Sequence, residues 1–373
     1  MARGEAAAPA DGLPPLYARW MRELLGGPPP AETRATCGDC AMLPRTADPA
    51  GTDYFFTPQI KCCTYLPELA NFLTGRILRD TDPASAEGRA TVERRLSAGV
   101  GVTPLGLGQP ASYLLWYNNS AASFGRARAL RCPHYLEEGG RCGVWRHRES
   151  TCATWFCKHD RGAVGRQFWR EGLHRLLKAV EGALARWCVL ELDPGSAALV
   201  RLVETTESGE TIDEGQLDGA VDPRTYRTLW GRWAGREREF FEACAARVDD
   251  LGWEEVAGIC GPDVRLFARL TREAYGQLHR HDVAPALRCG TFRVIWLRAN
   301  TARLSTYSDF DPIDVPAPVL GALQYFEAQP TGQALHAIAE QEGFTLEPAL
   351  IRKLTDFGVL VPATGRDDRR GPA

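Results

Sequence analysis

The chain has 373 residues, of which 44% are hydrophobic and 24% charged, and its 44 Lys and Arg against 47 Asp and Glu give a formal net charge of −3 at pH 7. This length suits two or three domains, each with a hydrophobic core of its own. The near-balance of charge disfavours a protein whose whole surface attracts nucleic acid or anionic lipid, although a local basic patch stays open.

The N-terminal sequence lacks the apolar core of a secretory signal, and no run of about 18 uncharged apolar residues occurs anywhere. We therefore expect a cytoplasmic protein without membrane contact. Twelve cysteines in a reducing compartment are not expected to form a disulfide framework. Eight of the twelve precede Asp160, and such clustering favours metal binding.

Hydrophobic periodicity predicts a mainly helical chain. Apolar residues recur at helical spacing from Val164 to Leu184, which predicts one long amphipathic helix ending near Trp187. The glycine-containing run 99–110 is not followed by Gly-Lys-Ser or Gly-Lys-Thr, so we expect a plain loop there. Further helices are expected over 16–25, 67–75, 91–96, 226–248, 264–279, 315–328, 331–343 and 346–357, and strands over 112–119, 189–194, 289–299 and 358–361.

The last three helices and the strand that follows them are typical of a winged-helix-type domain. The predicted fold class is therefore mainly α with small β elements, divided into an irregular cysteine-rich metal-binding domain, a helical middle and a winged-helix-like C-terminal domain. The expected boundaries are a partly ordered leader (1–34), the cysteine-rich domain (35–160), the helical domain (161–290), the winged-helix-like domain (291–363) and a disordered tail (364–373).

The cysteines before Asp160 have spacings that suit metal ligation. A Cys-x2-Cys turn lets two thiolates converge on one metal, and Gly38 in this turn permits a positive φ. Zinc and iron–sulfur clusters are typically held by four thiolates each. The candidate ligands are Cys37, Cys40, Cys62, Cys63, Cys132, Cys142, Cys152 and Cys157.

The adjacent pair Cys62-Cys63 poses a geometric problem. Successive side chains of an extended segment point to opposite faces, so the two thiols could serve two different centres, or one could ligate while the other packs. If both bind one ion, the backbone must be kinked at this point. The other four cysteines, Cys188, Cys244, Cys260 and Cys289, are scattered in apolar segments, and we interpret them as buried free thiols.

The run CPHYLEEGGRCGVW from Cys132, followed by Arg148, Cys152 and Cys157, resembles the YkgJ family of zinc- or iron-chelating proteins. The resemblance covers roughly residues 35–160. It departs from the family pattern in the long separation of Cys40 from Cys62, and in Arg148-Glu149-Ser150 where the family has Arg-Pro. Flagellin lysine methylase is similar to this family, which implies an iron–sulfur cluster and a protein substrate.

The residues leave two metals open. An all-cysteine ligand set, an apolar shell and nearby cations favour an iron–sulfur cluster, expected as 4Fe-4S. The alternative is zinc, because a histidine could replace a thiolate. The shell residues are Trp145, Trp155, Phe156 and Trp169, the cations Arg146, Arg148 and Lys158, and the histidines His134, His147 and His159.

The C-terminal segment does not have the side chains of a DNA reader, because Arg352 and Lys353 are the basic residues of its last helix and acidic residues flank them. With Asp311-Pro-Ile-Asp314 at its start, the segment resembles the small PqqD-like domains, which implies a peptide partner. A domain that only packs against the helical middle is the alternative.

Two functions follow from the sequence. The first is a metalloprotein whose centre supports redox or group-transfer chemistry on a protein or peptide, as a methylase-like modifying enzyme would. The second is a non-enzymatic scaffold stabilised by zinc, or a metal- or redox-sensing regulator, that binds a partner through the C-terminal domain.

Overall fold

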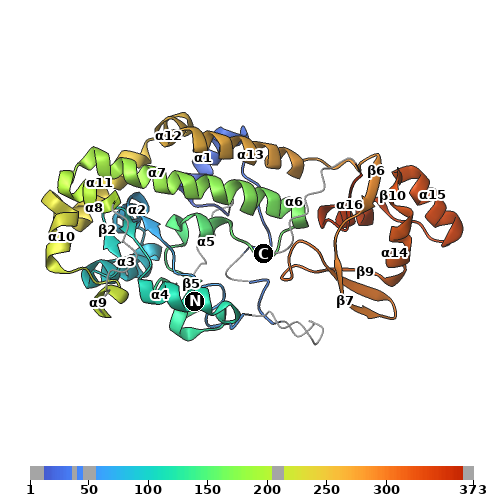
Figure 1. The fold of residues 1–373 in the computed structure, drawn as a ribbon, viewed down its shortest axis with the longest axis horizontal. Helices are drawn as coiled ribbons and strands as arrows, with labels where there is room; N and C mark the ends of the chain where they lie inside the picture. Colours follow the sequence, from blue (N-terminus) through green and yellow to red (C-terminus); the bar gives the residue numbers. More distant parts are fainter. Residues whose placement is uncertain (1–11, 36–39, 45–55, 204–213, 364–373) are drawn as a thin grey trace. The chain divides into compact units, whose positions relative to one another are not determined.

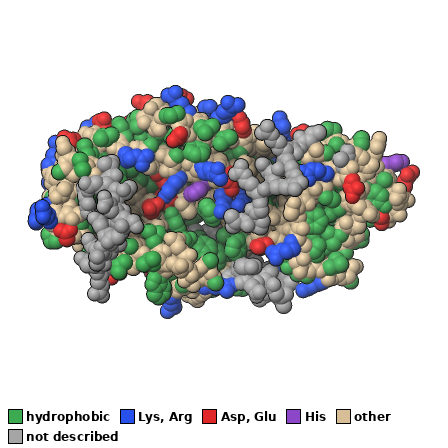
Figure 2. Space-filling view, in the orientation of Figure 1, with side chains coloured by type: hydrophobic (Ala, Val, Ile, Leu, Met, Phe, Trp, Pro, Cys, Tyr) green, Lys and Arg blue, Asp and Glu red, His purple; other side chains and the backbone are tan. Residues whose placement is uncertain are grey.

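The computed structural model describes residues 12–35, 40–44, 56–203 and 214–363. Helices predominate in these residues, and each sheet has only two or three strands (Figure 1). The expected fold class, mainly α with small β elements, is therefore confirmed. None of the described helices combines the length and the apolar composition needed to cross a membrane. Acidic and basic side chains are interspersed on the face shown in Figure 2.

The chain divides into two compact units, which we call unit 1 (Met1–Trp155 with Gly172–Arg272) and unit 2 (Phe156–Glu171 with Glu273–Ala373). This division differs from the expected boundaries after residues 160 and 290. Most of the helical middle packs with the cysteine-rich segment, because the apolar faces of its helices are buried against that segment. The two therefore share one hydrophobic core.

The core of unit 1 is helical, with α2 packed on α11 and α7, and α12 packed on α7 and α1. The helices of unit 1 are α1 (Pro15–Leu25), α2 (Asn71–Arg79), α3 (Ala86–Ala98), α4 (Ala111–Asn119), α5 (Ser150–Thr154), α7 (Arg175–Leu192), α8 (Ser196–Val203), α9 (Glu214–Leu217), α10 (Pro223–Trp230), α11 (Glu237–Asp249) and α12 (Trp253–Cys260). Its strands are β1 (Leu69–Ala70), β2 (Val102–Thr103), β3 (Gly106–Leu107), β4 (Tyr135–Leu136) and β5 (Arg141–Cys142), and α13 (Pro262–Leu278) continues from unit 1 into unit 2.

The expected leader helix is present as α1, and its predicted apolar face of Leu16, Trp20 and Leu24 is buried. The predicted long amphipathic helix is also present. It runs through α6 (Gly162–Arg166), a π-helical segment (Gln167–His174) and α7, and it ends at Leu192. The segment 189–194, expected as a strand, is therefore mostly the last turn of α7, which closes on Asp193 in the left-handed region (φ 38°).

Three further expectations are wrong. Residues 112–119 form a helix, α4, in which Tyr113 and Tyr117 stack on one face with ring centroids 5.5 Å apart, because a short apolar run does not distinguish a strand from a helix by period. The expected helix over 226–248 is interrupted, because Gly231 and Gly235 adopt positive φ between α10 and α11. The loop 99–110 contains the hairpin of β2 and β3, to which β1 adds in the order β1-β3-β2.

Gly75 sets the distance between α2 and α11. A Cβ at this position would lie 1.8 Å from the Phe241 carbonyl oxygen, so only glycine allows the two helix backbones to approach this closely. The helix was expected to end at Gly75 but continues to Arg79. The glycine serves the packing of the helices here and is not a stop signal.

The described residues of unit 2 form two antiparallel three-stranded sheets. One has the order β7-β8-β9, from β7 (Arg293–Arg298), β8 (Thr301–Ser305) and β9 (Ile313–Pro316), and includes the strand expected over 289–299. The other has the order β10-β6-β11, from β10 (Glu327–Pro330), β6 (Ala286–Cys289) and β11 (Leu360–Pro362). The helices α14 (Ala317–Ala322), α15 (Thr331–Gln341) and α16 (Pro348–Asp356) share one core with both sheets.

We predict that Gly75→Ala lowers the free energy of unfolding by about 3 kcal/mol, because the added methyl group forces α2 away from α11. Chemical denaturation of the purified variant measures the change. The matched control is Gly258→Ala in α12, where a Cβ meets nothing within 4 Å; it should leave stability unchanged or raise it by up to about 1 kcal/mol. Equal stability of the two variants would contradict this account of the α2–α11 contact.

Candidate metal centre

The Cys62-Cys63 pair lies in a sharp turn. Lys61, just before it, is a non-glycine residue with φ 55°, in the left-handed region. Its side chain is buried, and its Nζ donates a hydrogen bond to the Gly140 carbonyl oxygen at 2.7 Å, which helps to hold the conformation. The kink that would let both thiols face one site is therefore present.

The two thiols of this turn contact each other. A hydrogen bond between them lowers the pKa of Cys62 and raises that of Cys63, and burial raises the Cys63 pKa further. Cys62 therefore holds the more stable thiolate of the pair. Cys62 is also exposed, so this side of the centre is accessible from solvent.

Cys132 is fixed to this turn from a distant part of the sequence. Its backbone N–H donates to the Cys63 carbonyl oxygen at 2.7 Å. The position of Cys142 relative to Cys132 is set by the hairpin of β4 and β5, in which Tyr135 is paired with Cys142. The Gly143 N–H donates to the His134 carbonyl oxygen at 2.8 Å and extends this pairing by one step.

Two glycines let α3 pack directly on the cysteine hairpin. A Cβ at Gly88 would lie 1.7 Å from the Gly143 carbonyl oxygen, and one at Gly143 would lie 2.8 Å from the Gly88 Cα. The backbones therefore touch without side chains between them. This contact fixes the position of Cys142 against the helical core of unit 1.

Cys152 is positioned by the first turn of α5. The buried Glu149 is the N-cap of this helix and accepts hydrogen bonds from the N–H groups of Thr151 (2.6 Å) and Cys152 (2.8 Å). Arg148 Nε donates to the Cys152 carbonyl oxygen at 3.1 Å. The Tyr65 hydroxyl donates to Thr151 Oγ1 at 3.3 Å and ties α5 to the Cys62-Cys63 turn.

The thiols of these segments are close enough to affect one another's protonation. Burial, followed by the neighbouring Cys142 thiol, raises the pKa of Cys132 to about 12. Burial and the Glu149 carboxylate raise the pKa of Cys152 well above its usual value, with smaller effects from Cys142, Cys132 and Cys62. The structure thus gathers five of the predicted ligands in one region of unit 1, and we call Cys62, Cys63, Cys132, Cys142 and Cys152 the cysteine cluster.

The structure describes two of the other three predicted ligands, Cys40 and Cys157. Cys37 lies outside the described residues. Cys40 is described in the short segment 40–44, where its carbonyl oxygen accepts a hydrogen bond from the Leu43 N–H at 3.1 Å. Cys157 belongs to unit 2, which begins at Phe156.

The histidines of this region have other partners. The buried His134 ring contacts Thr91 Oγ1 at 2.7 Å through Nδ1 and Arg95 at 3.5 Å through Nε2, and burial lowers its pKa to about 3. His147 Nε2 contacts Asp80 at 2.9 Å. In unit 2, the His159 backbone N–H donates to Asp311 at 3.0 Å.

The donor set of the cysteine cluster, five thiols, is chemically suited to zinc or to an iron–sulfur cluster. Within the described ranges, however, no three His, Cys, Asp or Glu side chains already stand where they could hold one metal ion. Metal binding would therefore require both loss of thiol protons and side-chain adjustment.

Glu181 is a buried polar residue of this region that was not predicted from the sequence. The Glu181 carboxylate accepts hydrogen bonds from the Ser150 N–H (2.6 Å) and Oγ (2.7 Å) and from the Tyr17 hydroxyl, beside the buried Glu149. The available signal was the position of Glu181 on the apolar face of its helix, four residues after Leu177. An acidic residue at such a position calls for a buried partner.

Comparison of the chain with protein-family models, with curated proteins and with solved structures gave no match.

We predict that Glu181→Gln becomes more stable relative to the wild type as the pH rises. Burial, followed by the neighbouring Glu149, raises the Glu181 pKa to about 8. Between about pH 5 and 8 the folded protein therefore holds a proton that the unfolded chain has released, and stability falls as the pH rises through this window. Glutamine does not titrate and removes that loss.

Thermal unfolding at several pH values measures this difference, which should change by about 1–3 kcal/mol across the window. Glu254→Gln, at an exposed position of α12, is the control and should follow the wild type throughout. A wild type and a Glu181→Gln variant with parallel pH profiles would refute the raised pKa.

Proposed function

We propose that unit 1 is a metalloprotein module that binds an iron–sulfur cluster, or alternatively zinc, through the cysteine cluster. The observation that carries the proposal is the approach of Cys132, Cys142 and Cys152 to the Cys62-Cys63 turn, held by backbone hydrogen bonds and by the hairpin of β4 and β5. Cys37, Cys40 and Cys157 remain proposed additional ligands.

Two buried cations support an anionic centre. Lys61 and Arg95 are each 7% exposed, and they act electrostatically on Cys62 and Cys132 respectively. Burying a positive charge is costly unless a negative charge lies near it. Thiolates bound to metal would supply that charge, and these two residues take the role that the sequence reasoning gave to other cations.

An iron–sulfur cluster bound here would supply electron transfer or support group transfer. The residues of the chain have their own parts in this proposal. Lys61, whose backbone is in the left-handed region, bends the chain immediately before the two thiols of Cys62 and Cys63. Glu149 caps α5 and so orients Cys152. The neutral His134, two residues after Cys132, contacts Thr91 and Arg95 through its ring nitrogens.

The resemblance to the YkgJ family and to flagellin lysine methylase makes a protein or peptide the proposed substrate. For unit 2 we propose a winged-helix-like arrangement in which α14, β10, α15, α16 and β11 follow in chain order and β6 is the central strand. Its proposed role is to bind a peptide or protein partner. Arg352 donates to the His281 carbonyl oxygen at 3.0 Å, which leaves α16 poorly equipped to read DNA.

The alternative function is a scaffold that zinc stabilises without any reaction. It draws on the same observation, because a structural zinc site can contribute on the order of 10 kcal/mol to folding. A coloured protein containing iron and sulfide after anaerobic purification supports the cluster. A colourless protein with stoichiometric zinc supports the scaffold.

We predict that Cys132→Ala and Cys152→Ala each reduce the metal content by at least about half, because every ligand contributes to a site of about four thiolates. Metal analysis of the purified proteins, with circular dichroism to verify folding, measures this. Cys244→Ala is the matched control, since Cys244 is buried and its carbonyl oxygen accepts from the Cys188 thiol at 3.8 Å, in a contact between α7 and α11. Equal metal content in all three folded variants would refute the ligand assignment.

A further inference from the structure

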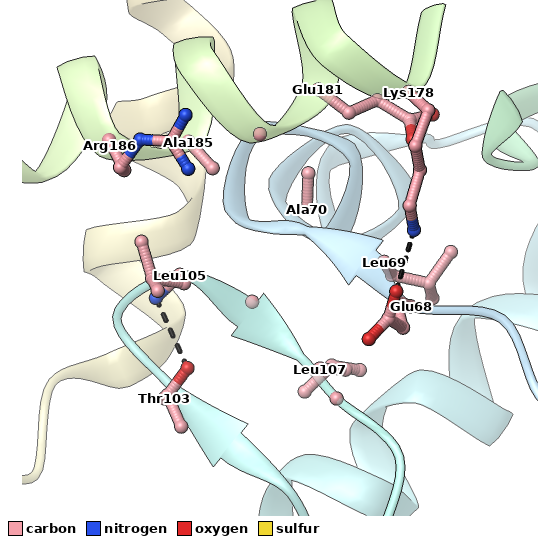
Figure 3. Close-up of a pocket in the computed structure, with 13 residues that line it drawn as sticks. Glu68, Leu69, Ala70, Thr103, Leu105, Leu107, Lys178, Glu181, Ala185 and Arg186 are labelled. Carbon is pink, nitrogen blue, oxygen red and sulfur yellow. Dashed lines mark hydrogen bonds and ion pairs between the residues drawn. The ribbon is translucent and has the colours of Figure 1, made fainter. Parts of the chain in front are cut away.

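Unit 1 has a pocket to whose lining Glu181 contributes. Its volume is about 350 Å³. Strands β1 and β3 and the turn before β3 form one wall, and one face of α7 forms the other. In Figure 3, Lys178 and Arg186 extend from α7 at opposite ends of the pocket, with Leu69, Leu105 and Leu107 on the strand side.

A buried asparagine, Asn71, lies between the two walls of the pocket and forms hydrogen bonds with both. Asn71, which is fully buried, donates from Nδ2 to the Pro104 carbonyl oxygen of the turn (2.9 Å) and to the Ala185 carbonyl oxygen of α7 (2.8 Å). It also accepts from the Phe72 N–H at 2.7 Å. Because all these groups are buried and paired, the separation between hairpin and helix is fixed.

The space itself depends on Gly182. This glycine lies in the middle of α7, and a Cβ there would meet only the Arg186 guanidinium, with Nη1 at 3.6 Å and Nη2 at 3.9 Å. Helical side chains extend toward the N-terminus of their helix, which is why Arg186 lies over the position of Gly182. A larger residue at this position would occupy the pocket without backbone strain.

Of the charged side chains that line the pocket, some have a side-chain partner and Arg186 has none among the described residues. Lys178 Nζ and Glu68 Oε2 form an ion pair at 2.6 Å. The Glu181 carboxyl group accepts hydrogen bonds from the hydroxyl groups of Tyr17 and Ser150. Among the residues that the structure describes, none forms an ion pair or a side-chain hydrogen bond with Arg186. The pocket therefore offers a guanidinium without a carboxylate partner among the described residues, beside the partly exposed Leu105.

We propose that this pocket binds a small aliphatic carboxylate, with the carboxylate on Arg186 and the hydrocarbon chain between Leu105 and the Gly182 face of α7. A guanidinium binds a carboxylate through two parallel hydrogen bonds. Leu105 and Gly182 are partly exposed, so a hydrocarbon chain that covers them removes apolar surface from water, whereas Leu69 and Leu107 are already buried and form the floor of the pocket. A phosphate dianion would call for more donors than one arginine provides. This site is independent of the cysteine cluster.

The proposal is tested with hexanoate, using hexanol and hexylamine as probes of equal chain length, in a ligand-observed NMR titration of the full chain. The wild type should bind hexanoate saturably and at least about tenfold more tightly than either probe. No saturable binding of hexanoate, or equal binding of the three compounds, would overturn the proposal.

Two pairs of variants locate the site. Arg186→Gln should weaken hexanoate binding at least about tenfold, whereas Arg227→Gln, at an exposed position of α10, should not change it. Gly182→Leu should abolish binding, while Gly258→Leu in α12 should retain it, because a side chain there fills open space. Unfolding temperatures verify that all four fold. Unchanged binding by Arg186→Gln places the ligand elsewhere and refutes the assignment even if Gly182→Leu does not fold.

Discussion

The hydrogen bond from the Cys132 N–H to the Cys63 carbonyl oxygen, 2.7 Å long, joins the two cysteine-bearing halves of unit 1. The turn before it is held by Lys61, whose ammonium group binds the Gly140 carbonyl oxygen and so links the same two halves a second time. The Tyr135 hydroxyl of the β4–β5 hairpin adds a third link, because it donates to the Pro58 carbonyl oxygen just before the turn at 3.3 Å. With them, one segment positions the thiols of the other.

The polar interior of unit 1 is organised around these segments. Positive charge is buried next to the thiols, at Lys61 and Arg95, while two carboxyl groups, Glu149 and Glu181, are buried beside α5, and the raised pKa of Glu181 keeps it protonated near neutral pH. The carboxyl groups accept hydrogen bonds from backbone N–H groups and hydroxyl groups, so their burial is compensated locally. The cations donate hydrogen bonds to backbone carbonyl oxygens, Lys61 to Gly140 and Arg95 to Gly108, and the thiolates of a metal centre would add negative charge beside them.

Periodicity was sufficient to predict the elements that bury one face over several turns. The leader helix α1, the long helical run that ends in α7, and α13 have apolar residues at helical spacing, so their existence could be predicted from the sequence. The helix α4 could not be, because the five consecutive apolar residues 113–117 fit either period. The interruption between α10 and α11 depends on two glycines whose positive φ values the periodicity does not reveal.

The candidate site could be predicted only in part, because the sequence shows the cysteines but not the contacts that bring them together. Cysteine number and clustering led to eight predicted ligands, which include the five of the cysteine cluster, but contacts between distant segments decide which of them come together. The kink at Lys61 is an example, since nothing in the residue type indicates a left-handed backbone. The partition of the chain also escaped prediction, because packing between α2 and α11 depends on the absence of a side chain at Gly75.

The central claim is that thiolates of the cysteine cluster hold a metal centre in unit 1. X-ray absorption at the metal edge of the anaerobically purified full chain tests it most directly. The account predicts a first shell of sulfur at about 2.3 Å, as in thiolate-bound metal, which weakens in Cys132→Ala and is unchanged in Cys244→Ala. A first shell of oxygen and nitrogen without sulfur, or a sulfur shell that survives unaltered in Cys132→Ala, would contradict it.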